Sequence, residues 1–423
     1  MATEFKQKEM IVRPLNILIV CEHASNVFGG EAMLPLNYFR LLSKTEHHVY
    51  LITHERVKAS ILQLQDIDQD AVFYIPDTAI HRFLFKCSGP FPERVRVVTF
   101  GFLIHLVTQF YQWKIARKVI KAKRIDVIHE PAPVSATQPS VLFGLGKPVI
   151  IGPMNGGMSF PDGFEYMSGK LEKVLYKCVR VFSNIYNLLI PGKFFADLLL
   201  VANQRTRDSL PKFRLGRVVE MVENGVFTVK DAPLVSDKTS EILVLFVGRL
   251  VDWKAVDIAI DAVALTHTKV KLVILGDGPE RGFLEQHAKQ KPNINVQFLG
   301  MVPHAEVNAY YDQADIFVLP SLRECGGAVV LEAMSRGLPV IATNWGGPAD
   351  YITTETGYLI DPLSRDYLVK EFARVIDVLA VNPTLRYDIG MAAIQRIKQH
   401  FMWQSKINSM VQHYQEVIQQ HAQ

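Results

Sequence analysis

Short apolar runs alternate with longer helical patterns through the second half of this 423-residue chain. The apolar runs end at Gly, Pro, Ser or Thr, and they cover residues 243–247, 271–275, 295–299, 316–319 and 340–342. Helical patterns lie between them, for example at 257–265, 280–289 and 329–336. Such alternation predicts a parallel sheet covered by helices, and ligands of such open sheets bind outside the carboxyl ends of the strands. We therefore expect functional residues directly after these strands.

Two glutamates eight positions apart follow one of these strands. Glu324 stands in a polar loop before Gly326 and Gly327, and Glu332 lies two turns into the next helix. Free N–H groups at a helix start attract a diphosphate, and a carboxylate accepts short hydrogen bonds from sugar or ribose hydroxyls. The pair therefore suits a sugar nucleotide. For the pair taken alone, a capped amphipathic helix with two solvated glutamates is an equal alternative.

Other candidate residues follow neighbouring strands. Arg249, Gly276 and Glu324 each come after a strand end, so we expect them to share one rim of the sheet. Arg249 and Lys254 would supply positive charge to a diphosphate, on which negative charge grows as a glycosidic bond breaks. Taken singly, Arg249 could form a surface ion pair and Lys254 could be solvated at a helix start.

The stretch 321–343 resembles the signature of glycosyltransferase family 4, the retaining group 1 transferases of GT-B fold. That signature is Glu-x7-Glu before a Gly-x-Pro-Val run, and matching pieces extend through about residues 242–362. The resemblance implies two Rossmann-like α/β domains that face across a cleft, with a C-terminal helix crossing back to the first domain. It also assigns the donor diphosphate to Arg249 and Lys254, the sugar hydroxyls to Glu324 and the ribose to Glu332.

Two positions depart from the family pattern. Cys325-Gly326-Gly327 replaces the usual Gly-Phe-Gly, which bears on sugar preference because a large ring is missing. Ala255 replaces the usual Gly after Lys254, an exchange that we expect to be tolerated. Neither removes a proposed charge, so the resemblance still favours an active enzyme.

The first half shows the same pattern more weakly. A buried-strand run at 15–20 precedes Gly29 and Gly30, which the resemblance places against the donor phosphates, although most such pairs are turns. A second strand run delivers His129 to a rim position. The resemblance implies that His129 contacts the donor sugar or the reacting phosphate. A structural histidine bonded to a backbone carbonyl is the alternative.

The length suits two units of about 200 residues each. We predict an N-terminal acceptor-binding domain at 1–227, a nucleotide-sugar-binding domain at 242–402 and a C-terminal helix at 403–423 that packs back on the first domain. The weakly patterned stretch 228–241 is the predicted linker.

Composition bears on location and partners. Four cysteines are scattered without metal-ligand spacing, which predicts a reducing, cytoplasmic setting. Residues 1–13 are polar, so we expect no signal peptide, and no apolar run is long enough to span a bilayer. The net charge is only +4, but the positive charge is unevenly distributed along the chain. Two segments are strongly basic: 114–124, beside aromatic residues, and 170–180, before an apolar run. Such segments suit the anionic inner face of a membrane, with a solvated face as the alternative, and no motif indicates nucleic acid.

We therefore predict a retaining transferase that moves a sugar from a nucleotide-sugar donor to a glycan or lipid-linked acceptor in cell-surface polysaccharide or glycolipid biosynthesis. We expect no cofactor and no metal, because the Asp-x-Asp pairs at 66–70 lie in a polar helical stretch rather than at a strand end. A catalytically inactive GT-B partner subunit of a polysaccharide assembly complex is the alternative. Two other enzyme classes are disfavoured. A sugar-nucleotide 2-epimerase would lack the Glu-x7-Glu segment in this form, and a dinucleotide dehydrogenase would need Gly-x-Gly-x-x-Gly after the first strand, which this chain does not have.

Overall fold

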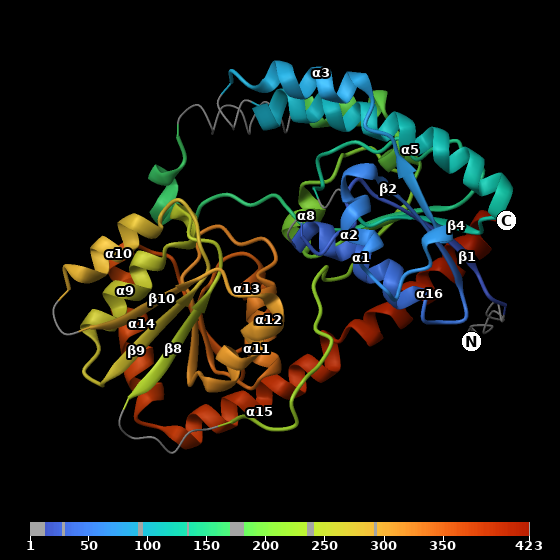
Figure 1. Cartoon of the computed structure of the whole chain (residues 1–423). Coiled ribbons are helices and arrows are strands. Elements are labelled where there is room, and N and C mark those ends of the chain that lie inside the picture. Colours follow the sequence, from blue (N-terminus) through green and yellow to red (C-terminus); the bar gives the residue numbers. More distant parts are fainter. Residues whose placement is uncertain are drawn as a thin grey trace, which may run out of the picture. The chain divides into compact units, whose positions relative to one another are not determined.

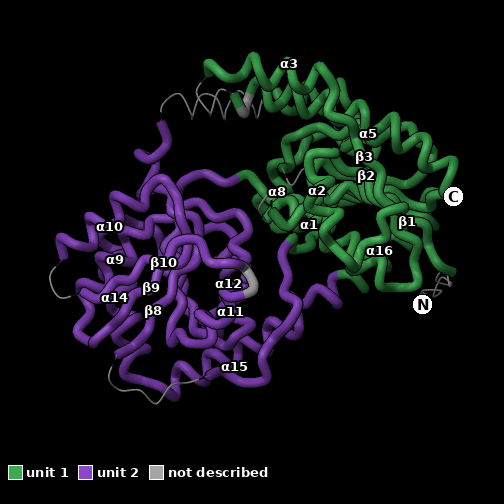
Figure 2. Tube along the Cα trace, in the orientation of Figure 1, with its two compact units in different colours: residues 1–157, 176–223, 407–423 green, residues 158–175, 224–406 purple. Residues whose placement is uncertain are grey.

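The chain forms two compact units. The computed structural model describes residues 13–27, 30–91, 96–132, 135–169, 182–234, 241–291 and 294–422. Unit 1 comprises 1–157, 176–223 and 407–423, and unit 2 comprises 158–175 and 224–406 (Figure 2). The predicted Gly29, the whole of the predicted basic segment 170–180 and the apolar residue 181 lie outside the described residues.

Unit 1 is built on a parallel seven-stranded sheet in the order β3-β2-β1-β4-β5-β6-β7 (Figure 1). Its strands are β1 (Asn16–Val20), β2 (His48–His54), β3 (Val72–Ile75), β4 (Val127–Glu130), β5 (Val149–Met154), β6 (Leu198–Val201) and β7 (Arg217–Glu220). Its helices include α1 (Gly30–Leu42), α2 (Lys58–Leu62), α3 (Ala79–Ser88), α5 (Phe102–Lys123), α7 (Gly192–Phe195) and α8 (Gln204–Asp208), and a further helix covers 182–189. The central strands form the core because nearly every residue of β1, β4 and β5 is buried.

Unit 2 has a parallel six-stranded sheet in the order β10-β9-β8-β11-β12-β13. The strands are β8 (Ile242–Val247), β9 (Val270–Leu275), β10 (Asn295–Gly300), β11 (Ile316–Leu319), β12 (Val340–Thr343) and β13 (Gly357–Ile360). The helices are α9 (Val256–Leu265), α10 (Arg281–Lys289), α11 (His304–Gln313), α12 (Ala328–Ser335), α13 (Gly347–Tyr351), α14 (Arg365–Ala380) and α15 (Pro383–His400). The five apolar runs of the second half thus form β8 to β12 as predicted.

The unit boundaries differ from the predicted domain boundaries at residues 158–175 and 224–227. Residues 158–175 belong to unit 2, although the sequence placed them in the first domain. The indole N–H of Trp345 donates to the carbonyl of Ser159 at 2.9 Å, and a Cβ on Gly163 would lie 2.2 Å from the carbonyl oxygen of Leu363. These contacts with segments that are distant in the sequence hold 158–169 to unit 2, and no local sequence pattern predicts them.

The last helix, α16 (Trp403–His421), contributes to both units. Its residues up to 406 belong to unit 2 and those from 407 belong to unit 1. Met410, Tyr414 and Val417 are fully buried at the three- and four-residue spacing of one helix face. The tail of the chain is therefore part of the core of unit 1. Among the described residues, no helix is both long enough and apolar enough to span a membrane.

Candidate donor site

A cavity lies at the carboxyl ends of three neighbouring strands of unit 2, where ligands of parallel sheets bind. It has a volume of about 420 Å³ and is lined by Val247, Gly248, Arg249, Leu275, Gly276, Asp277, Met301, Val302 and Val307. Two of the predicted site residues, Arg249 and Gly276, therefore share this cavity. Neither Glu324 nor Glu332 is among the lining residues.

Gly276 brings two strand ends into backbone contact beneath the cavity. Its φ is +130°, and a Cβ there would lie 1.9 Å from the carbonyl oxygen of Gly248. Its N–H donates to the carbonyl of Gly300 at 2.8 Å. Only glycine combines this conformation with so close an approach, so a larger residue here would push the cavity wall apart.

Lys254 lies beside the same wall and is bonded to Glu324. Its Cε lies 4.0 Å from the position of a Cβ on Gly248. Its ammonium forms an ion pair with the Glu324 carboxylate, and the two side chains are 15% and 13% exposed. The other carboxylate oxygen of Glu324 accepts the N–H of Gly327 at 3.1 Å. Both oxygens of Glu324 are thus engaged, and the pair is held in one orientation.

Backbone contacts bring the loops of Lys254 and Glu324 together. The N–H of Leu322 donates to the carbonyl of Trp253 at 2.8 Å, and the N–H of Gly347 donates to the carbonyl of Glu324 at 2.9 Å. Gly327 then starts α12 with a φ of +64°. The first helical amides of α12 therefore follow directly after the Glu324 loop.

Ala255, one of the departures from the family pattern, has a φ of +49° and caps α9. Glycine adopts this left-handed region readily, whereas alanine is strained in it by about 1–2 kcal/mol. The exchange is therefore accommodated at a cost in stability, with the loop before Ala255 still placing Lys254 against Glu324.

Glu332 is oriented by a tyrosine that the sequence did not single out. The Tyr311 hydroxyl donates to Oε2 of Glu332 at 2.9 Å, and Tyr311 is only 1% exposed. Burial raises the pKa of Tyr311 well above its usual value, so it remains a donor. Tyr311 stands 21 positions before Glu332, a separation that no periodicity rule would flag.

His129 of unit 1 is a fully buried histidine with both ring nitrogens engaged. Nε2 lies 2.7 Å from the carbonyl oxygen of Gly152, and Nδ1 lies 2.8 Å from the hydroxyl of Tyr414. Burial lowers the pKa of His129 to about 4, so the ring is neutral. This is the geometry of the alternative, a structural histidine bonded to a backbone carbonyl. The predicted contact of His129 with donor gains no support from it. Gly30 is the first residue of α1, with open space where a Cβ would project.

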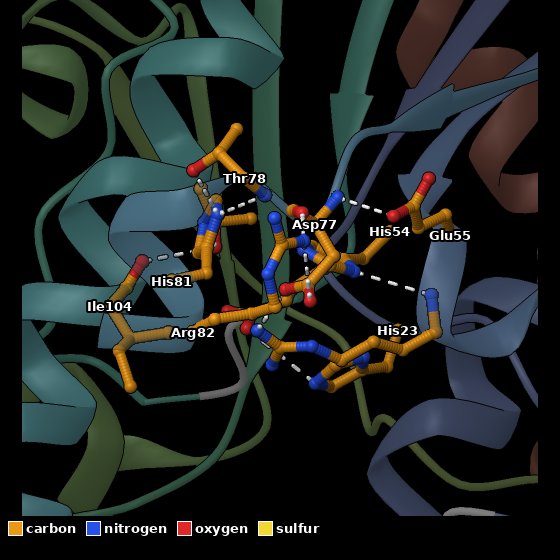
Figure 3. A network of polar contacts seen from close by, with 11 residues as sticks. His23, His54, Glu55, Asp77, Thr78, His81, Arg82 and Ile104 are labelled. Atoms are coloured by element: carbon orange, nitrogen blue, oxygen red, sulfur yellow. Dashed lines mark hydrogen bonds and ion pairs between the residues drawn. The ribbon is translucent and has the colours of Figure 1, made fainter. Parts of the chain in front are cut away.

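A polar network at the carboxyl ends of β2 and β3 contains a group with metal-ligand chemistry. His54, Asp77 and His81 place one ligand atom each within 4.8 Å of the others (Figure 3). However, Nδ1 of His54 accepts the N–H of Arg56 at 3.2 Å, so the neutral ring carries its proton on Nε2 and offers no free lone pair.

The other two members of this group are already engaged as well. Nδ1 of His81 accepts the N–H of Thr78 at 3.1 Å, and its Nε2 lies 3.1 Å from the hydroxyl of Thr108. Arg56 forms an ion pair with Asp77 at 3.1 Å, and this contact lowers the pKa of Asp77 despite partial burial. We therefore assign the group a structural role, tying the start of α3 to β2 and α5.

Comparison with known proteins decides the family. The model of the glycosyl transferases group 1 matches residues 231–395. The GPI3 subunit of phosphatidylinositol N-acetylglucosaminyltransferase from Saccharomyces cerevisiae is 31% identical over 383 residues, which cover 86% of this chain and 75% of that subunit. The chain belongs to the group 1 glycosyltransferases. All the predicted donor-site residues of unit 2 lie within the matched region.

Two further comparisons bear on the extent of this likeness. The 2-deoxystreptamine N-acetyl-D-glucosaminyltransferase of Niallia circulans is 30% identical over 188 residues, and the match spans 42% of this transferase and 48% of that enzyme. The crystal structure of HepE from Anabaena in complex with UDP shares the fold, with a TM-score of 0.63 at 16% identity over 94% of this chain and 99% of that one. The predicted GT-B class, with two Rossmann-like sheets, is therefore confirmed.

Proposed function

We propose that this group 1 glycosyltransferase moves a sugar from a nucleotide-sugar donor bound in unit 2, with retention of configuration and without a metal. The observation that carries the proposal is the cavity of about 420 Å³ at the strand ends, lined by Arg249 and Gly276 and flanked by Lys254. It offers two cations and glycine backbone at one rim. A nucleoside diphosphate leaving group needs these features, because its negative charge grows as the glycosidic bond breaks.

In the proposed reaction, the bond between the anomeric carbon and the leaving phosphate oxygen breaks, and the acceptor hydroxyl bonds to the same face of that carbon. The acceptor proton passes to the leaving phosphate. A double displacement would instead need a free carboxylate nucleophile. Glu324 is poorly suited to that role because Lys254 and the Gly327 N–H engage both of its oxygens. We assign Glu324 to the donor sugar hydroxyls and Glu332 to the ribose.

Charge balance on the leaving diphosphate comes, in this proposal, from Arg249, Lys254 and the amides that start α12. When donor binds, Lys254 would exchange part of its contact with Glu324 for the diphosphate. The freed carboxylate oxygen would then accept a sugar hydroxyl. A single movement of the Lys254 side chain would thus allow contacts with both the diphosphate and the sugar of the donor.

We propose a glycan or lipid-linked acceptor, and a chain that works in the cytoplasm at the inner face of a membrane. Support for a lipid-linked acceptor comes from the name of the yeast relative, a phosphatidylinositol N-acetylglucosaminyltransferase subunit. The Niallia relative is also an N-acetylglucosaminyltransferase, so the nucleotide conjugates of N-acetylglucosamine are the first donors to test.

Thermal unfolding of the purified chain with UDP, GDP, ADP and their sugar conjugates tests the donor site, because a ligand that binds the folded state raises the melting temperature. We expect a rise with one nucleotide that is lost in Arg249→Ala and Glu332→Ala. Arg374→Ala is the matched control, since Arg374 is 58% exposed on α14 and pairs with Glu371. No rise with any nucleotide would favour the alternative of an inactive partner subunit.

A further inference from the structure

Three helices of unit 1 bury polar side chains and expose apolar ones. In the helix 182–189, Ser183 and Asn187 are buried, whereas the outward residues are apolar. Those outward residues are Phe182, Ile185, Leu188 and Leu189, at 57%, 51%, 61% and 76% exposure. Their three- and four-residue spacing puts them on one face. This is the reverse of a surface helix in a water-soluble protein.

α3 and the first half of α5 show the same reversal. The buried residues of α3 are His81 and Ser88, while Ile80, Phe83 and Phe85 are exposed. In α5 the buried residues of the first half are His105, Thr108, Gln109 and Gln112, while Leu103 and Phe110 are exposed. An exposed apolar side chain is ordinary when it stands alone, but three neighbouring helices with this pattern mark an interaction surface.

Polar contacts join α3 to α5, and they join both α5 and the helix 182–189 to the loop 135–140. His81 on α3 lies 3.1 Å from the Thr108 hydroxyl on α5. Gln109 on α5 donates to the carbonyl of Pro139 at 2.8 Å, and Asn187 donates to the carbonyl of Thr137 at 2.9 Å. Figure 1 shows α3 lying along α5, and the rings of Phe102 and Tyr186 are 5.5 Å apart. The helices are therefore neighbours whose buried seams are polar.

Charge identifies the kind of surface that would cover these side chains. Residues 79–125 contain ten Lys and Arg, six of them at 114–124, and one acidic residue, Glu93. Residues 182–195 contain no acidic residue, and their one cation, Lys193, is buried. On α3, Arg82 and Lys86 are exposed between the apolar residues. Exposed apolar side chains interleaved with cations match a bilayer interface that carries anionic headgroups.

We propose that α3, the first half of α5 and the helix 182–189 form a bilayer-docking surface, whose apolar side chains enter the lipid interface while the surrounding Lys and Arg contact anionic headgroups. The proposal deepens the peripheral membrane association of the proposed function and rests on it. The basic segment 114–124 alone did not identify which residues would enter the lipid. In this proposal, the apolar contact comes from α3 and the helix 182–189.

Flotation of the full chain with phosphatidylcholine vesicles, with and without phosphatidylglycerol, tests the surface. We expect binding to the anionic vesicles that weakens in salt. Phe83→Gln/Phe85→Gln and Leu188→Gln/Leu189→Gln should each lower vesicle partitioning roughly tenfold. Arg117→Glu/Lys118→Glu should lower it only for anionic vesicles. The control Leu265→Gln/Phe283→Gln changes apolar residues of unit 2 that are 50% and 56% exposed, and it should bind as the wild type does.

The same samples separate the docking surface from the donor site. Nucleotide-induced stabilisation reports on unit 2, so intact stabilisation with lost flotation supports docking by this surface. Intact stabilisation with no vesicle binding by the wild type overturns the proposal and leaves the donor site standing. If the two double Gln variants of the apolar residues bind vesicles as the control does, the proposal is wrong. It is also wrong if these variants convert a dimer into a monomer in light scattering, because the surface would then bind a second copy of the chain.

Discussion

Lys254 and Glu324, 70 positions apart, form an ion pair beside the donor cavity of unit 2. The pair joins the loop after β8 to the loop after β11, and a backbone bond from Leu322 to Trp253 reinforces that junction. We propose that the Lys254 ammonium binds the donor diphosphate and that the Glu324 carboxylate binds the sugar hydroxyls. The ion pair therefore keeps both side chains in position before the donor binds.

Removing the cation should weaken nucleotide binding. We expect Lys254→Met to lower affinity for the preferred nucleoside diphosphate about 10- to 100-fold, because a charged hydrogen bond contributes about 1.5–3 kcal/mol. Calorimetric titration measures this. Lys289→Met, at an exposed lysine on α10, is the control. Equal affinity of Lys254→Met and the control would remove Lys254 from the donor site.

Tyr311 should act through Glu332 on the ribose. Tyr311→Phe removes only the hydroxyl that donates to Glu332 at 2.9 Å, so we expect nucleotide affinity to fall about fivefold, equivalent to about 1 kcal/mol. The measurement is repeated with the 2′-deoxy and 3′-deoxy nucleotides. If Glu332 binds a ribose hydroxyl, the effect of Tyr311→Phe should shrink for the analogue lacking that hydroxyl. An equal loss with all three nucleotides would indicate a general packing defect instead.

Ala255→Gly should stabilise the protein. The residue has a φ of +49°, where alanine is strained by about 1–2 kcal/mol, while glycine costs about 0.5–1 kcal/mol in unfolded-state entropy. We expect a net gain of about 0.5–1 kcal/mol in urea unfolding of unit 2. Ala262→Gly, inside α9, should instead destabilise. A loss at both positions would show that the backbone at Ala255 is not strained.

His129 should make unit 1 sensitive to acid. Its folded pKa is lowered from 6.5 to about 4, so the unfolded state binds the proton first as pH falls. Stability is unaffected above pH 6.5, falls between 6.5 and about 4, and levels off below that, for a total of about 3 kcal/mol from this residue.

His129→Gln can keep both contacts without titrating, and it should therefore reduce the acid-induced loss. Hydrogen exchange of β4 amides at pH 7 and pH 4.5 measures the difference. His267→Gln, at an exposed histidine of unit 2, should leave it unchanged. A wild-type pH dependence in His129→Gln would mean that other groups, such as His54, dominate.

Five of the six strands of unit 2 were predictable because each is a short apolar run that ends at a turn or at a residue needing special backbone geometry, such as Gly276, whereas β13 was not predicted. Arg249 and Gly276 could be placed at one cavity for the same reason: both follow parallel strands. Lys254 and Glu324 were each identified from the family pattern, but their pairing depends on loop contacts that only the folded chain shows.

The features that could not be predicted from the sequence depend on contacts between residues that are far apart in the chain. His129 is bonded to Tyr414, 285 positions later, so the residues around it could not decide between the donor contact and the structural alternative. The segment 158–169 joins unit 2 through Trp345 and Leu363, which no local boundary signal reveals. The reversed helices of unit 1 also look ordinary in sequence, since periodicity separates two faces without saying which one is buried.

Release of nucleoside diphosphate from the donor panel, measured in EDTA, tests directly whether unit 2 holds a catalytic donor site that needs no metal. We expect that one nucleotide sugar is turned over in EDTA, that Arg249→Ala abolishes this turnover, and that Arg374→Ala leaves it intact. Turnover of no donor by a chain that still binds the nucleotide, or turnover that requires an added divalent cation, would contradict this expectation.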